Sequence, residues 1–286
     1  MSDLGTALVD FVVLLVAALV PSLVYLAWVR RSERYETQGW GPLLTTFAYG
    51  ALVATIVAAI LEVILVSVGT AVSQAYPAPE FVFLNGNSSL GAFFLVLVIA
   101  PFVEEGLKAT GVTRASARLR IVSDGLVIGA AAGFGFGFFE TFLYGIGALA
   151  TGGLAAGLIL ILVRSISSVV LHGSTTSMFG YGYAAGRLER RAGAPAGYYL
   201  LAVGMHSGFN ALASAGAIVA FLGFGTTYQD LASILALLLA VVYAFAAIEH
   251  ARAVIQRTDF PGALANHPRF QPPPSRRSVG EPPRNR

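Results

Sequence analysis

The sequence predicts an all-α fold, a polytopic membrane helix bundle of about seven transmembrane helices with its N-terminus outside and its C-terminus cytoplasmic. Two observations predict it: the apolar composition and the placement of the basic residues. Hydrophobic residues make up 56% of the chain and charged residues only 12%, and the mean hydropathy is +0.73. Soluble domains carry about 25% charged residues. The chain therefore needs lipid as part of its solvent.

Seven apolar stretches are long enough to cross about 30 Å of hydrocarbon. They lie at residues 5–29, 43–69, 90–112, 123–149, 153–186, 197–220 and 228–251. The fifth stretch is longer than a bilayer requires, so we expect it to be tilted, kinked around Gly173 or Gly180, or extended past the lipid.

The basic residues follow every second stretch, apart from Lys108 and Arg164, which lie inside stretches. They are Arg30, Arg31 and Arg34; Arg114, Arg118 and Arg120; Arg187, Arg190 and Arg191; and Arg252, Arg257, Arg269, Arg276, Arg277, Arg284 and Arg286. Cytoplasmic loops collect Lys and Arg, so this alternation predicts the orientation. It also explains the pI of about 9.3 without a nucleic-acid partner.

Two regions differ in composition. Residues 1–257 form the predicted transmembrane domain, in which the polar motifs concentrate at about 90–220. Residues 258–286 are rich in Pro and Arg and have no apolar period. We expect them to form a disordered cytoplasmic tail.

The third stretch contains Glu104, Glu105 and Lys108. A charge in the bilayer centre costs at least about 2.5–3.5 kcal/mol, so these residues are candidates for function. Glu104 and Lys108 are four apart and are expected to form an ion pair. Glu105 points about 100° away and is expected to lack that partner. Snorkelling to the interface explains Lys108 equally well, but it explains two adjacent glutamates poorly.

Three further stretches also carry polar residues. Glu140 lies deep in the fourth, beside small residues at 129–137 that allow close helix packing. Its expected partner is Arg164, His172 or Lys108, and a purely structural ion pair is the alternative. In the fifth stretch Arg164 and His172 are eight apart and lie on roughly the same face. In the sixth stretch His206 and Asn210 are four apart and share a helix face. We expect these groups to meet in one hydrated cavity.

Glutamates and histidines in one apolar site favour hydrolysis by an activated water. A buried glutamate can act as general base, and His or Asn210 can stabilise an oxyanion. The chain has no cysteine, which excludes a thiol nucleophile. Zinc bound by His172, His206 and a Glu is the alternative. The H-E-x-x-H motif is missing, so we favour catalysis without a cofactor.

The ordered motifs resemble the PrsW-type intramembrane proteases, distant relatives of the CAAX-prenyl-protease and bacteriocin-processing membrane proteases. They are E-E-x-x-K at Glu104, Glu105 and Lys108, F-x-x-x-E at Phe136 and Glu140, a histidine at His172, and H-x-x-x-N at His206 and Asn210. The resemblance covers about residues 100–211. Lys108 and Glu140 distinguish it from the CAAX-type pattern.

This resemblance implies a glutamic-type endopeptidase in the cell membrane that cuts membrane-anchored proteins, in bacterial members anti-sigma factors. It implies that Glu104 and Glu105 activate water. The resemblance does not say which of the two is the base; we favour Glu105, because Lys108 can engage Glu104. His172, His206 and Asn210 would act at the carbonyl, and Lys108, Glu140, Phe136 and Arg164 would support them. A proton- or cation-coupled transporter or channel and an inactive scaffold remain as alternatives. The oligomeric state is not predicted.

Overall fold

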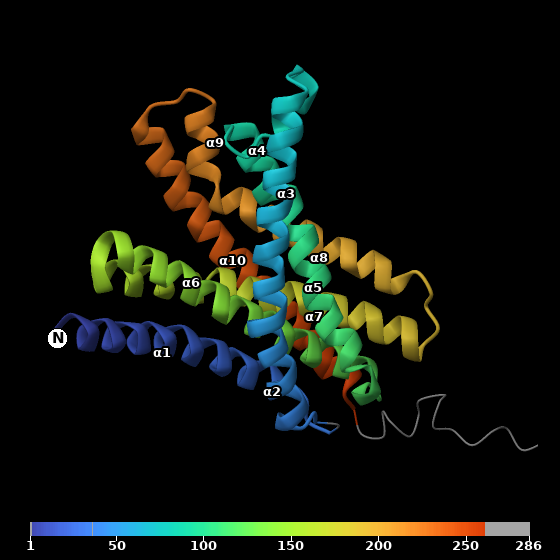
Figure 1. The fold of residues 1–286 in the computed structure, drawn as a ribbon. Helices are drawn as coiled ribbons and strands as arrows, with labels where there is room; N and C mark the ends of the chain where they lie inside the picture. Colours follow the sequence, from blue (N-terminus) through green and yellow to red (C-terminus); the bar gives the residue numbers. More distant parts are fainter. Residues whose placement is uncertain (1, 36, 261–286) are drawn as a thin grey trace, which may run out of the picture.

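The computed structural model describes residues 2–35 and 37–260, which form helices joined by turns and short connections, without a β-strand (Figure 1). The all-α fold class is therefore confirmed. The tail predicted at 258–286 lies outside the described residues from position 261 onward.

The elements follow one another with short connections. The first half contains α1 (Ser2–Arg30), α2 (Trp40–Ala48), the π-helix η1 (Tyr49–Ala54), α3 (Thr55–Ala75), the 3-10 helix η2 (Pro79–Leu84), α4 (Ser89–Phe94), the π-helix η3 (Leu95–Ile99) and α5 (Ala100–Arg114). The second half contains the 3-10 helix η4 (Ser116–Arg118), α6 (Val122–Ser165), α7 (Ser168–Leu188), α8 (Ala194–Ala213), α9 (Ala215–Phe221) and α10 (Thr226–Thr258).

Five helical stretches among the described residues are long and apolar enough to cross a membrane. They are Leu4–Arg30, Trp40–Ala75, Ser89–Arg114, Val122–Leu188 and Thr226–Thr258. The protein is thus a multi-pass membrane protein. The helical stretch Val122–Leu188 turns back on itself near Gly153, whose φ of 76° departs from helical geometry. Helix α6 therefore begins a hairpin that α7 completes (Figure 1). The count of seven crossings and their orientation stay predictions.

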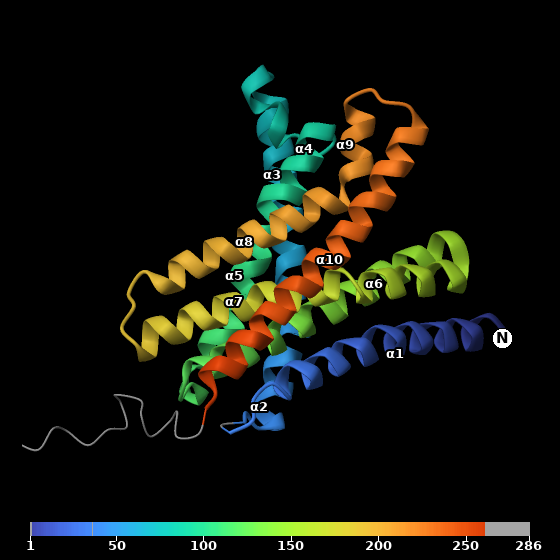
Figure 2. The same cartoon turned by 180° about the vertical axis from the view of Figure 1, so that it is seen from behind.

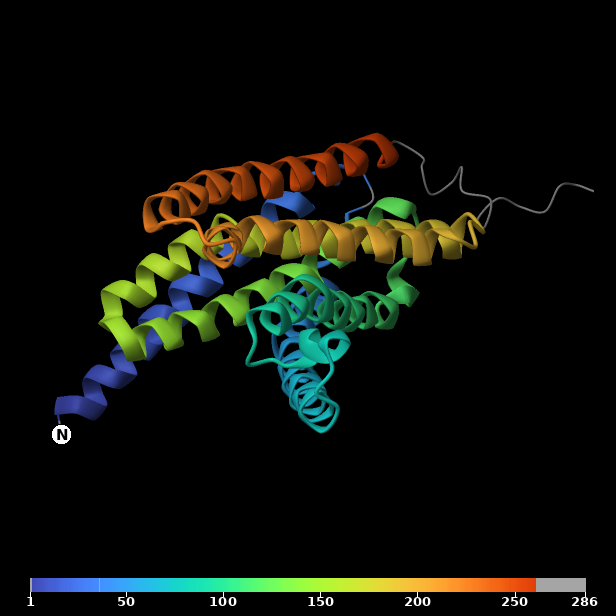
Figure 3. The same cartoon turned by 90° about the horizontal axis from the view of Figure 1, so that it is seen from above.

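The helices α6 and α7 form the centre of the molecule. Helix α1 lies along α6, while α8 and α10 lie along α7 (Figure 2). Viewed from above, α3 and α5 lie on the opposite side of this centre from α10 (Figure 3). Most buried apolar side chains of α6 and α7 belong to one hydrophobic core, whereas Phe136 of α6 packs in a second, smaller cluster with Ala54 and Ala58.

Glycines bring α6 and α7 unusually close together. A Cβ atom at Gly129 would lie 2.2 Å from the Thr176 carbonyl oxygen, and one at Gly133 would lie 2.0 Å from the His172 carbonyl oxygen. Only residues without a side chain allow such backbone contact. The small residues at 129–137 therefore permit the expected close packing, and they determine how near the backbone of His172 lies to α6.

The π-helix η3 has a local cause in the sequence. Pro101 follows it, in the first turn of α5. Proline has no N–H to donate, and its ring crowds the carbonyl four residues earlier, so a regular α-helix cannot continue through this point. The wider turn of η3 accommodates the proline just before Glu104.

The arginine-rich ends of α1, α5 and α10 meet at one end of the bundle. The Asp259 carboxylate accepts hydrogen bonds from the backbone N–H groups of Arg34 and Tyr35. The side-chain amide of Gln38 donates to Asp124, at the start of α6. The connection between α1 and α2 is therefore fixed to α6 and to the end of α10.

Candidate active site

Lys108 connects both members of the glutamate pair on α5. Its Nζ lies 3.3 Å from Glu104 Oε2 and 2.9 Å from Glu105 Oε1, and its side chain is fully buried. The pair of Glu104 with Lys108 is as predicted. The expectation that Glu105 lacks this partner is wrong, because residues three apart are also neighbours on a helix and the long lysine chain reaches both carboxylates.

Glu105 is held on all sides. Its Oε1 accepts hydrogen bonds from Thr175 Oγ1 at 3.0 Å and from His206 Nδ1 at 3.0 Å, in addition to Lys108. Its Oε2 accepts from Thr176 Oγ1 at 3.3 Å. A carboxylate only accepts, so the Nδ1 of His206 carries the proton. Helices α7 and α8 are thereby joined to α5.

The two threonines were not among the predicted residues. Thr175 and Thr176 follow His172 by three and four positions, so they share its helix face and face α5. That spacing is the signal in the sequence from which they could have been found.

Glu140 joins α6 to the start of α7. Its Oε2 lies 2.7 Å from Arg164 Nη2 and 2.8 Å from His172 Nε2. Both were among the partners expected for it. Arg164 also lies over the ring of Tyr144, at 3.9 Å. A break at residues 166–167 separates α6 from α7, yet Arg164 and His172 still reach the same carboxylate.

The hydrogen bonds of His172 fix the orientation of its ring. Its Nδ1 lies 2.8 Å from Lys108 Nζ. An ammonium group only donates, so Nδ1 accepts, and the Nε2–H donates to Glu140. The ring of Phe136 packs against His172 at 5.1 Å between centroids and lies 4.1 Å from Lys108 Nζ. Phe136 therefore supports both residues.

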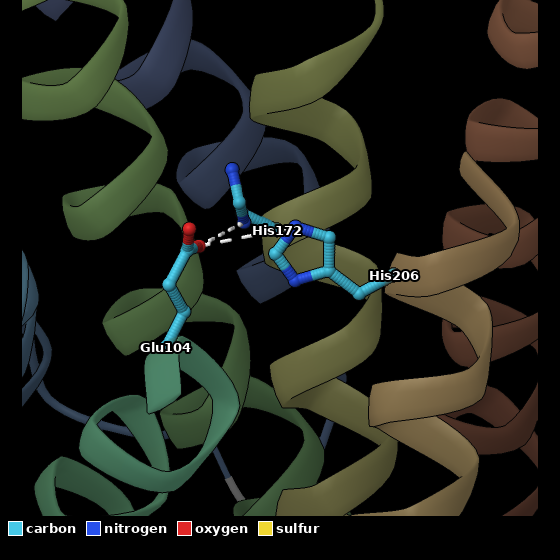
Figure 4. Close-up of side chains that lie close together, drawn as sticks. All are labelled: Glu104, His172 and His206. Atoms are coloured by element: carbon cyan, nitrogen blue, oxygen red, sulfur yellow. Dashed lines mark ion pairs between the residues drawn. The ribbon is translucent and has the colours of Figure 1, made fainter. Parts of the chain in front are cut away.

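Glu104 faces the two imidazoles. Its Oε2 lies 4.0 Å from His172 Nδ1 and 3.8 Å from His206 Nε2. Figure 4 shows this oxygen directed at both rings. The three side chains come from α5, α7 and α8, and all three are buried.

These groups border a cavity of about 420 Å³. Glu104, Glu140, His172 and His206 line it, whereas Glu105 and Lys108 lie behind its wall. Asn210 also lines the cavity, but its Nδ2 donates to the Val96 carbonyl oxygen at 2.8 Å. Asn210 therefore supports η3 and forms no hydrogen bond with the glutamate pair.

The chain matches the family described as "PrsW family intramembrane metalloprotease" over residues 38–248. The chain belongs to the PrsW family. No curated protein and no solved structure matches it. Family membership makes the protein a membrane-embedded peptidase, and the matched region contains every site residue named above.

The PrsW family is described as metalloproteases, and three side chains of this site could hold a metal ion. One ligand atom each from Glu104, His172 and His206 lies within 4.8 Å of the others. The second nitrogen of each ring contacts a carboxylate, Glu140 or Glu105, as is usual for histidines that bind a metal. Ligand atoms around tetrahedral zinc lie roughly 3.3–3.5 Å apart.

The donor set therefore fits a metal ion after a small inward movement. Lys108 Nζ contacts two of these atoms, Glu104 Oε2 and His172 Nδ1, so the ammonium has to withdraw from them when an ion binds.

Proposed function

We propose that this protein is an endopeptidase that hydrolyses peptide bonds of membrane-anchored proteins, with a water molecule activated by Glu104. The observation that carries the proposal is the asymmetry of the glutamate pair. Glu104 faces the cavity, and its Oε1 makes no hydrogen bond with the described residues. Glu105, the base preferred from the sequence, is enclosed by four side-chain donors.

The geometry supports a specific division of roles. Glu104 accepts a proton from the attacking water and returns it to the leaving amide nitrogen. Glu105 positions His206, whose Nε2 lies 3.8 Å from Glu104 Oε2. To act at the substrate carbonyl, His206 has to be an imidazolium, because its Nδ1–H donates to Glu105 and only a protonated Nε2 can donate to an oxyanion. Asn210 can join it there only by giving up its hydrogen bond to Val96.

The second candidate is a metal-dependent form of the same peptidase. It is favoured by the ring nitrogens of His172 and His206 on the Glu104 side, because each carries its proton on the other nitrogen. Such lone pairs suit a metal ion. Glu104, His172 and His206 would hold the ion, and a bound Zn²⁺ would polarise a carbonyl and acidify a bound water.

The cellular setting is part of the proposal. A substrate anchored in the cell membrane suits a cavity enclosed by apolar helices, and regulatory cleavage of anti-sigma factors is the role implied by the resemblance.

The test uses the purified full chain in nanodiscs with a panel of single-span membrane proteins. We expect cleavage of at least one, and we expect Glu104→Gln to lower its rate by about 10²–10⁴-fold, the usual contribution of a general base. Glu80→Gln makes the same chemical change on the exposed helix η2 and should cleave normally. Retained cleavage in Glu104→Gln would exclude the proposed base.

Metal analysis separates the two candidates. The metal-dependent form requires about one bound ion per chain, lost in a His172→Ala, His206→Ala double variant. Full cleavage by protein shown to be metal-free would exclude it.

A further inference from the structure

Glu62 borders the same cavity but takes no part in the mechanism above. It lies on α3 at the end of a face formed by residues one turn apart, which are Thr55, Ala58, Ala59 and Glu62. Other positions of this helix carry exposed apolar side chains, such as Ile60 and Val63. Helix α3 thus turns apolar groups to the lipid and Glu62 toward the cavity.

The carboxylate of Glu62 lacks a partner. Its Oε1 is buried and forms no hydrogen bond with the described residues. Glu62 is also thirteen residues from the outer end of α3, about 20 Å along the helix axis. A short glutamate chain cannot reach the interface from that depth. An acceptor left in this state is costly unless a ligand satisfies it.

The other carboxylates that line the cavity each contact a cation. Glu104 pairs with Lys108, and Glu140 pairs with Arg164. Only Glu62, among the lining carboxylates of the described chain, has no cation in contact. The wall therefore has one carboxyl group, on α3, without a cation beside it.

The surroundings of Glu62 suit a long side chain with a charged end. Ala58 and Ala59 leave room one turn before it, and Leu95, Val96 and Leu143 provide apolar wall. The methylene chains of Lys and Arg pack on such surfaces while the charged end reaches a carboxylate.

We propose that Glu62 is a specificity-determining residue that receives a lysine or arginine side chain of the substrate's membrane-embedded segment. This inference rests on the proposed function, because its ligand is the segment to be cleaved. Placing a lysine or arginine inside a membrane costs free energy. An ion pair with Glu62 offsets part of that cost and so favours entry of the substrate segment into the cavity.

Binding tests this independently of cleavage. The probes are labelled single-span Leu/Ala peptides, each with one lysine at a different central position. Each has a control peptide with norleucine in place of that lysine. The full chain carries Glu104→Gln and sits in nanodiscs. At one position or two adjacent ones, we expect lysine to bind at least about tenfold more tightly, the size of one desolvated ion pair.

Further substitutions assign this preference to Glu62. Adding Glu62→Gln should remove it, and Glu62→Lys should reverse it in favour of a glutamate peptide. The matched change Glu80→Gln should leave it intact. A lack of lysine preference at every position, or a preference that survives Glu62→Gln, overturns the inference.

Cleavage of the same peptides by the unsubstituted chain is scored separately. Cleavage that requires Glu104 but shows no dependence on Glu62 supports the proposed function and overturns this inference. A Glu62-dependent preference without any cleavage supports the inference and contradicts the proposed function.

Discussion

At the scale of single residues, the two adjacent glutamates of α5 differ in their number of partners. Glu105 accepts from Lys108, Thr175, Thr176 and His206, on three helices. We expect Glu105→Gln to lower the free energy of unfolding by about 2–4 kcal/mol, because an amide NH₂ cannot accept from donors around a buried site. Glu104→Gln should stay within about 1 kcal/mol of the parent protein.

Thermal unfolding of both variants in nanodiscs measures this difference, with Glu80→Gln as the control. Equal losses of stability in Glu104→Gln and Glu105→Gln would contradict the asymmetry on which the choice of base depends.

Glu33 gives a pH-dependent prediction outside the membrane. It lies between α1 and α2, and burial raises its pKa from 4.5 to about 8, against the opposing effect of the Gln38 N–H. The folded protein binds this proton more tightly than the unfolded chain does. Its stabilising contribution is therefore complete below about pH 4.5 and is lost as the pH rises through 8.

We expect stability to fall by on the order of 2 kcal/mol between pH 6 and 9 because of Glu33. Glu33→Gln mimics the protonated form and should remove this part of the decline. The difference between the two thermal unfolding profiles isolates Glu33 from other titrating groups. Parallel profiles would show that Glu33 is charged in the folded protein.

Part of the site was predictable from residue types and spacing. The cost of buried charge singled out Glu104, Glu105, Lys108 and Glu140, and helical spacing paired Glu104 with Lys108. Spacing within one helix could not show that Lys108 also reaches His172, because that contact depends on how α5 and α7 pack. Spacing from His172 places Thr175 and Thr176 on its helix face, but their hydrogen bonds to Glu105 depend on the same packing of α5 against α7.

At the scale of elements, the distance between α6 and α7 determines where His172 lies. We expect Gly133→Ala to destabilise the protein by about 1–3 kcal/mol, because its Cβ would lie 2.0 Å from the His172 carbonyl oxygen. Displacing that backbone also moves the imidazole away from Glu104 and Glu140, so cleavage should fall with stability.

Gly147→Ala is the matched control on the same helix. A Cβ there meets no atom within 4 Å, so the change should be neutral or stabilise the helix by up to about 1 kcal/mol. Thermal unfolding and cleavage assays of both variants test the prediction. A Gly133→Ala protein as stable and active as Gly147→Ala would show that α6 and α7 can separate without harm.

The ends and irregularities of the helices were less predictable than their existence. Each of the seven apolar stretches coincides with helical structure, because hydropathy over twenty residues is a strong signal. The break at residues 166–167 has no proline. The kink expected around Gly173 or Gly180 in the over-long fifth stretch is therefore misplaced, because both glycines lie inside the continuous helix α7.

At the scale of the whole molecule, the number of crossings depends on α8 and α9. Helix α8 is not among the five candidate spans found in the described residues, because its polar side chains, including His206 and Asn210, lower its hydropathy. A membrane helix that contributes polar side chains to an active site has a lower hydropathy because of them. The arginine pattern nevertheless places Arg191 and Arg252 on the same side, so the number of crossings between them must be even. Because α10 is one candidate span, α8 and α9 have to supply the other.

The absence of cysteine allows a direct test of the predicted topology with single-cysteine variants and a membrane-impermeant maleimide on intact cells. Glu80→Cys lies in η2, and Gly225→Cys immediately precedes α10. Both should be labelled from outside, since they follow an even number of predicted crossings. Ala117→Cys and Gly193→Cys lie beside the arginine-rich segments and should react only after permeabilisation.

If Gly225→Cys is protected while Glu80→Cys is labelled, α8 and α9 do not cross the membrane. Labelling of Ala117→Cys from outside would reverse the orientation, and the site would then lie in the opposite half of the bilayer.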